Sequence, residues 1–109
     1  MKNKVEQYFN KFSNKDLLGL EKMFHPNVQL IDWDNNVSGR DKVLEANKQI
    51  FDKVDSVKVT ILQNACEDQT VFSELLINII VNGQSTFLNV VDVITFKDGK
   101  IYSIHAFKR

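Results

Sequence analysis

The stretch TVFSELLINIIVNGQSTFLNVVDVITFKDGKIYSIHAF, Thr70–Phe107, decides the fold of this chain. Apolar and polar residues alternate along it, which is typical of strands with one buried face. The pair Asn82-Gly83 tolerates positive φ angles at both positions and predicts a tight hairpin turn. Lys97-Asp98-Gly99-Lys100 turns the chain a second time. The stretch therefore predicts a meander of three antiparallel strands, over residues 70–81, 86–96 and 101–107.

Two further strands are predicted before the meander. Residues 57–61 alternate between apolar and polar, and Glu67-Asp68-Gln69 turns the chain toward the strand that begins at Thr70. An earlier strand is expected over residues 28–33, followed by a polar loop over residues 34–39. The predicted sheet thus contains one early strand and four late ones.

Three segments in the first half of the chain carry apolar residues at helical spacing. The first covers residues 5–12. The second follows a cap at Asn14 and ends at His25-Pro26, because proline disfavours helical geometry in the residue before it. The third opens with Ser38 and Asp41, which resemble a capping box. Helices first and strands last indicate an α+β domain, with the helices on one face of a curved antiparallel sheet.

The composition limits the classes of function to consider. A chain of 109 residues suits one domain, residues 1–109, and its 14 basic and 14 acidic side chains give a net charge of zero. That balance provides no general attraction to nucleic acid or anionic membranes. No apolar run approaches the roughly 20 residues of a transmembrane helix, and the first residues carry no apolar signal-peptide core. The single cysteine, Cys66, allows no internal disulfide. We therefore expect a cytoplasmic protein that binds neither nucleic acid nor membranes.

The alternation also assigns the two faces of the strands. One side of residues 70–81 is nearly all apolar and is expected to face the helices. In the next strand Asp92 stands in an otherwise apolar row, and Asp32 does so in the early strand. Burying an ionised carboxylate is costly unless it is paired or hydrogen-bonded. Two inward acids predict a polar spot inside an apolar cavity; the alternative is that each acid bonds a nearby backbone amide.

The opposite face of the predicted sheet is also unusually apolar. Its apolar residues are Phe72, Leu76, Ile80, Phe87, Val91 and Val93. Monomeric proteins rarely leave such a patch exposed to water, so the pattern predicts a homodimer packed sheet against sheet. The same alternation assigns Ile101, His105 and Trp33 to this outer face.

The order of the elements resembles the NTF2-like superfamily, a cone-shaped fold with a deep pocket. Gly39-Arg40-Asp41 at the start of the third helix and the stretch Asp92–Ile101 carry the resemblance, which covers essentially the whole chain. Within the superfamily the chain is most similar to the SnoaL-like and ketosteroid isomerase group. The resemblance implies three N-terminal helices packed on a strongly curved, mainly antiparallel sheet that encloses a pocket.

Three residues match the catalytic residues of ketosteroid isomerases. The catalytic tyrosine of that family, on the first helix, corresponds to Tyr8. Its general-base aspartate corresponds to Asp32, which follows Tyr8 by 24 residues. Its second aspartate corresponds to Asp92, which lies nine residues after Gly83. The resemblance implies that these three side chains form the catalytic site.

The chain also departs from the isomerase pattern. The proline that follows the base in many isomerases is Trp33 here, and two supporting tyrosines correspond to Phe24 and Asn47. The loop between Asp32 and Gly39 is shorter. These differences concern steroid specificity more than proton chemistry.

The implied chemistry is proton transfer without a cofactor or metal. Asp32 would remove a proton next to a carbonyl group, while Tyr8 and a protonated Asp92 would donate hydrogen bonds to the enolate oxygen. The implied reaction is a double-bond isomerisation or enolisation of a small apolar carbonyl compound. The residues expected to line its pocket are Phe24, Asn47, Leu75, Ile77, Val90, Ile104 and Ala106.

Other functions remain open on the same fold. A SnoaL-type polyketide cyclase also uses acids in the pocket, and a non-catalytic ligand-binding or dimerisation module needs no base. Limonene epoxide hydrolases need an arginine between two pocket acids, whereas the only arginines here are Arg40 and Arg109.

Overall fold

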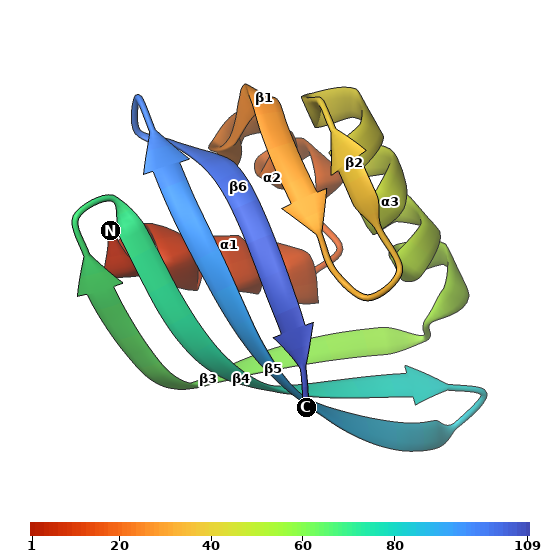
Figure 1. Ribbon diagram of the computed structural model, residues 1–109. Coiled ribbons are helices and arrows are strands. Elements are labelled where there is room, and N and C mark those ends of the chain that lie inside the picture. The colour runs from red at the N-terminus through yellow and green to blue at the C-terminus, as the bar shows by residue number, and fades with distance from the viewer.

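The computed structural model describes all 109 residues as three helices and six strands around one core (Figure 1). The helices are α1 (Lys2–Ser13), α2 (Leu17–Met23) and α3 (Arg40–Lys53). The strands are β1 (Phe24–Ile31), β2 (Asn36–Ser38), β3 (Ser56–Glu67), β4 (Thr70–Val81), β5 (Gln84–Lys97) and β6 (Lys100–Lys108). No helix is both long enough and apolar enough to span a bilayer.

The six strands form one sheet in the order β2-β1-β6-β5-β4-β3. All neighbouring pairs are antiparallel except β1 and β6, which are parallel. The sheet curves around α1, while α3 lies beside β1 and β2 (Figure 1). The predicted α+β architecture, with three helices packed on a curved and mainly antiparallel sheet, is confirmed.

Both hairpin turns of the meander have the backbone geometry that the sequence predicts. Asn82 and Gly83 have φ angles of 51° and 78°, and Asp98 and Gly99 have φ angles of 55° and 76°. Two successive positive φ angles match the right-handed twist of the flanking strands and fix the register of each hairpin. Because the register is fixed, the inward and outward rows of β4 and β5 follow directly from the alternation.

The core fills the space between the sheet and the helices. Its fully buried side chains include Leu20, Phe24, Val71 and Ile94, drawn from both layers. Ile101, assigned to the outer face by alternation, is also fully buried. The register between β5 and β6 shifts there, so that an extra residue in β6 reverses the side on which the first residues of β6 point.

Several predicted boundaries were wrong for local reasons. Asp16, not Asn14, caps α2, and its carboxylate accepts a hydrogen bond from Gly19 N at 2.9 Å. The capping box at Ser38 does not form, because Gly39 is the N-cap of α3 and no side chain caps it. The loop predicted over residues 34–39 contains the short strand β2, which pairs with β1.

Candidate functional site

A cavity of about 120 Å³ lies between the inner face of the sheet and helices α1 and α3. Strands β1, β3, β4, β5 and β6 and the turn that follows β1 supply the rest of its lining, which is hydrophobic at 15 of 18 residues. The three exceptions are Asp32, Asn47 and Asp92. The cavity is therefore an apolar space with a few polar groups, the usual composition of a small-molecule site.

The cavity brings together residues that are far apart in the sequence. Tyr8, Asp32 and Asp92 all line it, from α1, the end of β1 and the middle of β5. Six of the seven residues expected to line the pocket do so: Asn47, Leu75, Ile77, Val90, Ile104 and Ala106. Phe24 does not line the cavity; it is fully buried in the core, with its ring centroid 6.1 Å from that of Tyr8.

Asp92 is the most deeply buried acid of the cavity. Its residue is 7% exposed, and the carboxyl has no hydrogen-bond donor from the protein. Ser73, its register partner on β4, donates its hydroxyl hydrogen to Asn64 Oδ1 at 2.6 Å instead. Burial, and secondarily the charge of Asp32, raises the pKa of Asp92 to about 7. Near neutral pH this side chain is present in part as the neutral acid, which can donate a hydrogen bond.

Tyr8 occupies the buried face of α1 and lines the same cavity. Its ring packs against Phe9 and Phe12, with centroids 5.0 and 6.3 Å away. Burial raises the pKa of Tyr8 above its ordinary value, and the negative charges of Asp92 and Asp32 raise it further. The phenol therefore keeps its proton at physiological pH and is available as a donor.

Asp32 sits at the point where β1 ends. Its Oδ1 accepts hydrogen bonds from the backbone N–H groups of Asp34 at 2.8 Å and Asn35 at 2.7 Å. The side-chain amide of Asn35 donates to Oδ1 at 3.1 Å and to Oδ2 at 3.2 Å. For Asp32 the alternative interpretation, that the acid bonds nearby backbone amides, is therefore correct. Its carboxylate closes a tight turn, and the residue also lines the cavity. These donors stabilise a negative charge and leave Oδ2 with one long hydrogen bond.

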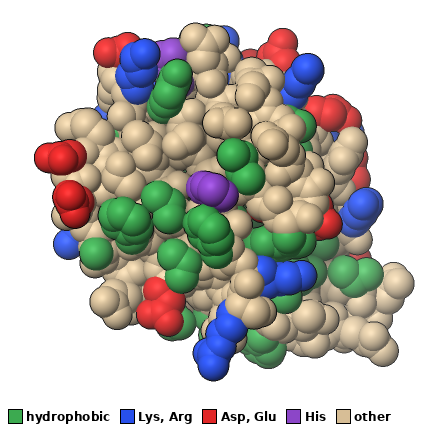
Figure 2. All heavy atoms as spheres, viewed as in Figure 1, with side chains coloured by type: hydrophobic (Ala, Val, Ile, Leu, Met, Phe, Trp, Pro, Cys, Tyr) green, Lys and Arg blue, Asp and Glu red, His purple; other side chains and the backbone are tan.

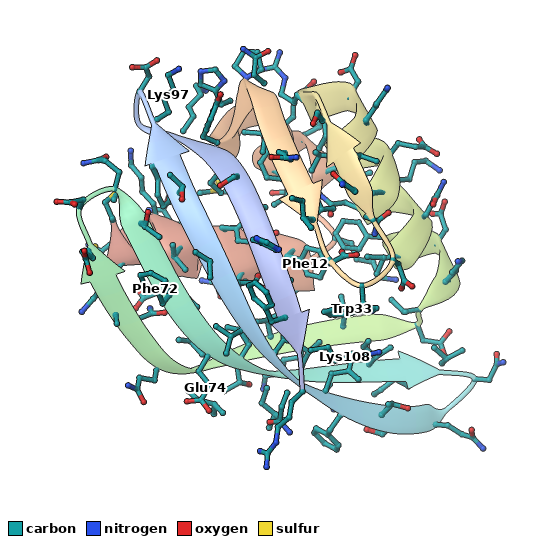
Figure 3. All side chains as sticks on the ribbon, viewed as in Figure 1. Phe12, Trp33, Phe72, Glu74, Lys97 and Lys108 are labelled. Atoms are coloured by element: carbon teal, nitrogen blue, oxygen red, sulfur yellow. The ribbon has the colours of Figure 1, made fainter.

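Trp33 lines the rim of the cavity, although the alternation assigned it to the outer face. The assignment fails because β1 ends at Ile31 and the turn around Asp32 breaks the two-residue period. Trp33 is 43% exposed, and Lys108 Nζ lies 5.0 Å from the centroid of its ring, a cation–π contact (Figure 3). Trp33 thus borders one side of the cavity, with Lys108 packed on its ring.

The amide of Asn47 is enclosed but unpartnered. The residue is 3% exposed, and its Nδ2 makes no hydrogen bond within the protein. It faces the cavity because it stands on the same side of α3 as Val43 and Phe51, which are also buried. A buried amide without a partner is uncommon and calls for an explanation.

The two histidines lie away from the cavity. His25 packs edge-on against Tyr102, and its Nε2 is 3.9 Å from the carboxylate of Asp98. His105 is exposed on the outer face of the sheet and stacks on Phe107 at 4.4 Å. No group of three His, Cys, Asp or Glu side chains has an arrangement that could hold a metal ion.

Residues 5–104 match the family model described as a SnoaL-like domain. None of the curated proteins compared with the sequence matches it significantly. The structural comparisons, in contrast, give many matches over nearly the whole chain. The family match covers most of the chain, including Tyr8, Asp32 and Asp92.

Three solved structures illustrate the range of similar proteins. An LEH-like epoxide hydrolase from M. tuberculosis superimposes with a TM-score of 0.88 at 16% identity, over 98% of this chain and 80% of that one. An NTF2-like protein of unknown function from Burkholderia pseudomallei gives 0.88 at 16%, over 99% and 89%. A protein from Catenulispora acidiphila with a ketosteroid isomerase-like fold, in complex with trimethylamine, gives 0.87 at 14%, over 95% and 83%. At these identities the likeness establishes the fold alone.

Proposed function

Since this chain belongs to the SnoaL-like domain family of the NTF2-like superfamily, we propose that its cavity catalyses proton transfer next to the carbonyl group of a small apolar compound. The observation that carries the proposal is the carboxyl of the buried residue Asp92, which receives no hydrogen bond from the protein in a cavity that it shares with Tyr8 and Asp32. Such a carboxyl is costly unless it is neutral, and a neutral carboxyl can donate a hydrogen bond to a developing oxyanion.

The proposed reaction moves one proton and needs no cofactor. The carboxylate of Asp32 takes a proton from the carbon between the carbonyl group and a carbon–carbon double bond. The electron pair of that C–H bond moves into the conjugated system and leaves a dienolate. Its oxygen accepts hydrogen bonds from Tyr8 and neutral Asp92. Asp32 then returns the proton to the far carbon, which gives the conjugated isomer.

Geometry and burial support the division of roles. Asp32 accepts hydrogen bonds from donors in its own turn, and only the side chain of Asn35 donates to its Oδ2, at 3.2 Å. Tyr8 and Asp92 are buried, and burial raises the pKa of each. A base in a turn at the cavity wall and two proton-bearing groups inside it are the parts that enolisation requires.

The test is the conversion of cyclohex-3-enone to its conjugated isomer, followed by ultraviolet absorbance. The wild-type protein should accelerate the conversion, and Asp32→Asn should reduce kcat by about 10²- to 10⁴-fold, because an amide cannot accept the proton. Asp34→Asn is the matched control: Asp34 is an exposed acid in the same turn and does not line the cavity. Equal rates in wild type and Asp32→Asn would overturn the proposal.

A second candidate function is binding of a small ligand without catalysis. One observation favours it, namely that the Asp32 carboxylate has a structural role in its turn. In that case a phenol would bind the cavity, Tyr8→Phe would weaken binding, and neither wild type nor Asp32→Asn would isomerise an enone. The enone assay of wild type and Asp32→Asn therefore also distinguishes the catalytic function from the binding function.

We also propose that the outer face of the sheet pairs with a second copy of the chain. Figure 2 views this face and shows hydrophobic side chains around a histidine. Phe72, Val91 and Phe107 are 41%, 39% and 52% exposed; the strand register pairs Val91 with Phe107 and places Phe72 diagonally across from Val91. A two-fold axis along β5 would bring β4 of one copy over β6 of the other.

Sedimentation analysis at micromolar concentration tests this pairing. The wild-type protein should be a dimer, and Phe107→Glu should be a monomer because a charge would enter the apolar contact. Leu18→Glu is the control, since Leu18 is 73% exposed on α2, away from the sheet's outer face. A monomeric wild-type protein, or a dimeric Phe107→Glu variant, would contradict the proposal.

A further inference from the structure

Two buried side-chain polar atoms have no hydrogen-bond partner, Arg40 Nε and Asn47 Nδ2. Only Asn47 lines the cavity. None of the hydrogen bonds around Asp32 includes Asn47, and the carboxyl of Asp92 receives none from it. The Asn47 amide is therefore a polar group separate from the proposed base and oxyanion donors.

An unpartnered amide in an apolar wall lowers the stability of the folded protein, and an apolar residue at the same position would not. Leaving a buried donor unsatisfied disfavours the folded state. The neighbours of Asn47 in the lining, such as Ile50 on the same helix, are apolar, so leucine at this position would be compatible with its surroundings. An amide is useful here if a polar atom of a bound molecule completes its hydrogen bonds. Rotation of the amide by 180° presents either its donor or its acceptor end.

The volume of the cavity limits the size of the molecule that it can bind. A cavity of about 120 Å³ is close to the roughly 150 Å³ engineered cavity that binds benzene, and well below the ~300–1,000 Å³ of sites for larger ligands. One six-membered ring therefore fills the enclosed part, and four fused rings do not fit within it. Any further group would have to leave through the rim at Trp33.

From the enclosed amide and the small apolar volume we propose that the ligand is a one-ring carbonyl compound with a second hydrogen-bonding group on the ring, and that Asn47 binds this second group. This inference rests on the proposed function, because the carbonyl end is assigned to Tyr8 and Asp92. Asn47 is then the residue that determines specificity, since it distinguishes a ring with a second polar substituent from one with a methyl group.

Binding of matched phenols tests the assignment. A phenol resembles the dienolate, and a hydroxyl and a methyl group are nearly equal in size. The ligands are resorcinol and hydroquinone, compared with 3-methylphenol and 4-methylphenol, and dissociation constants are measured by calorimetry. For at least one ring position the wild-type protein should prefer the second hydroxyl over the methyl group by about 3- to 10-fold, the range expected for one hydrogen bond.

Asn47→Leu should reverse this preference, binding the methylphenol more tightly and the dihydroxybenzene more weakly. Asn47→Ala should abolish the preference and serves as a second variant if leucine disturbs folding, which thermal unfolding would reveal. Tyr8→Phe is the matched control, because it should weaken the binding of both ligands of a pair by the same factor.

The outcomes separate this inference from the function on which it rests. The same preference in wild type, Asn47→Leu and Asn47→Ala would overturn the role of Asn47 and leave the proton-transfer proposal intact. A wild-type protein that binds methylphenols at least as well as dihydroxybenzenes at both positions would do the same. Failure of all four phenols to bind would overturn both proposals.

Discussion

The end of β1 and the middle of β5 each contribute one carboxyl to the same cavity, in opposite surroundings. The Asp32 carboxylate is half-buried and accepts backbone hydrogen bonds from Asp34 and Asn35. The Asp92 carboxyl is almost fully buried, has no donor, and has its pKa raised to about 7 by burial and then by the charge of Asp32. The same type of side chain thus accepts hydrogen bonds in one place and is available as a proton donor in the other.

The difference originates in the local backbone. A strand end leaves N–H groups free of the ladder, and a carboxylate in a turn can accept them. In the middle of β5 the backbone groups are used by β4 and β6 on both sides, so none remains for the side chain. Position within the sheet therefore assigns the two carboxyls different chemical roles.

The largest expected effect comes from exchanging each acid for its amide. Asp32→Asn should lower kcat for the enone by about 10²- to 10⁴-fold, because the base is lost. Asp92→Asn should lower it by less than about tenfold, since the amide can still donate a hydrogen bond. Asp92→Ala, which lacks any donor, should lose about 10²- to 10³-fold. Equal losses in Asp32→Asn and Asp92→Asn would show that the two acids do not differ in role.

The stability of the folded protein should reveal the proton on Asp92. Between about pH 4 and pH 7 the native protein holds a proton that the unfolded chain has released, because the pKa of Asp92 is raised from 3.8 to about 7. The free energy of unfolding therefore falls across this interval as pH rises, by about 4 kcal/mol from this group, and the loss is complete above pH 7. The measurement is urea unfolding of wild type and Asp92→Asn at a series of pH values.

Asp92→Asn should become more stable relative to wild type as pH rises from 4 to 7, and the difference should then stay constant. Asp34→Asn, which changes an exposed acid in the turn, is the control and should not reproduce this pattern. Parallel curves for wild type and Asp92→Asn would mean that Asp92 does not hold its proton in the folded state.

The pH dependence of catalysis should follow the same proton. The wild-type kcat is expected to decline as pH rises above about 7, by up to tenfold per pH unit, because the donor form of Asp92 is lost. The other titratable groups lining the cavity are Tyr8 and Asp32, and the raised pKa of Tyr8 keeps that group neutral throughout. Asp92→Asn should show no such decline. A decline at the same pH in the variant would assign it to another group.

The features that could be predicted from the sequence are those set by strand periodicity and turn chemistry. Asp92 lies within a long regular strand between two hairpins of fixed register, so alternation alone identified its inward side. Trp33 was assigned to the wrong face because the turn at Asp32 ends the two-residue alternation of the strand. Ile101 was assigned to the wrong face because a bulge in β6 shifts the alternation there by one residue. In both cases the cause is a local hydrogen-bonding pattern, a turn or a bulge, that the alternation of apolar and polar residues does not predict.

The helical contributions to the site were harder to predict. Asn47 has apolar neighbours at helical spacing, but a polar residue in such a pattern is as compatible with the edge of the buried face as with the cavity. Its orientation depends on how α3 docks beside β1, which is a tertiary effect. Phe24, expected in the lining, instead starts β1 and packs behind Tyr8.

The smallest expected effect concerns the residue that orients Asp32. Asn35 donates from its side chain to both carboxylate oxygens, at 3.1 and 3.2 Å. Asn35→Ala removes these donors but retains the two backbone hydrogen bonds, so the carboxylate stays in its turn with more freedom. We expect kcat to fall by about 3- to 10-fold, the equivalent of one modest hydrogen bond, with no change in the dissociation constant of a phenol. Asn36→Ala, which alters the exposed neighbour, should leave both quantities unchanged. A loss of phenol binding in Asn35→Ala would mean that the turn shapes the cavity as a whole, and the contrast between a positioned base and a buried donor would then have to be abandoned.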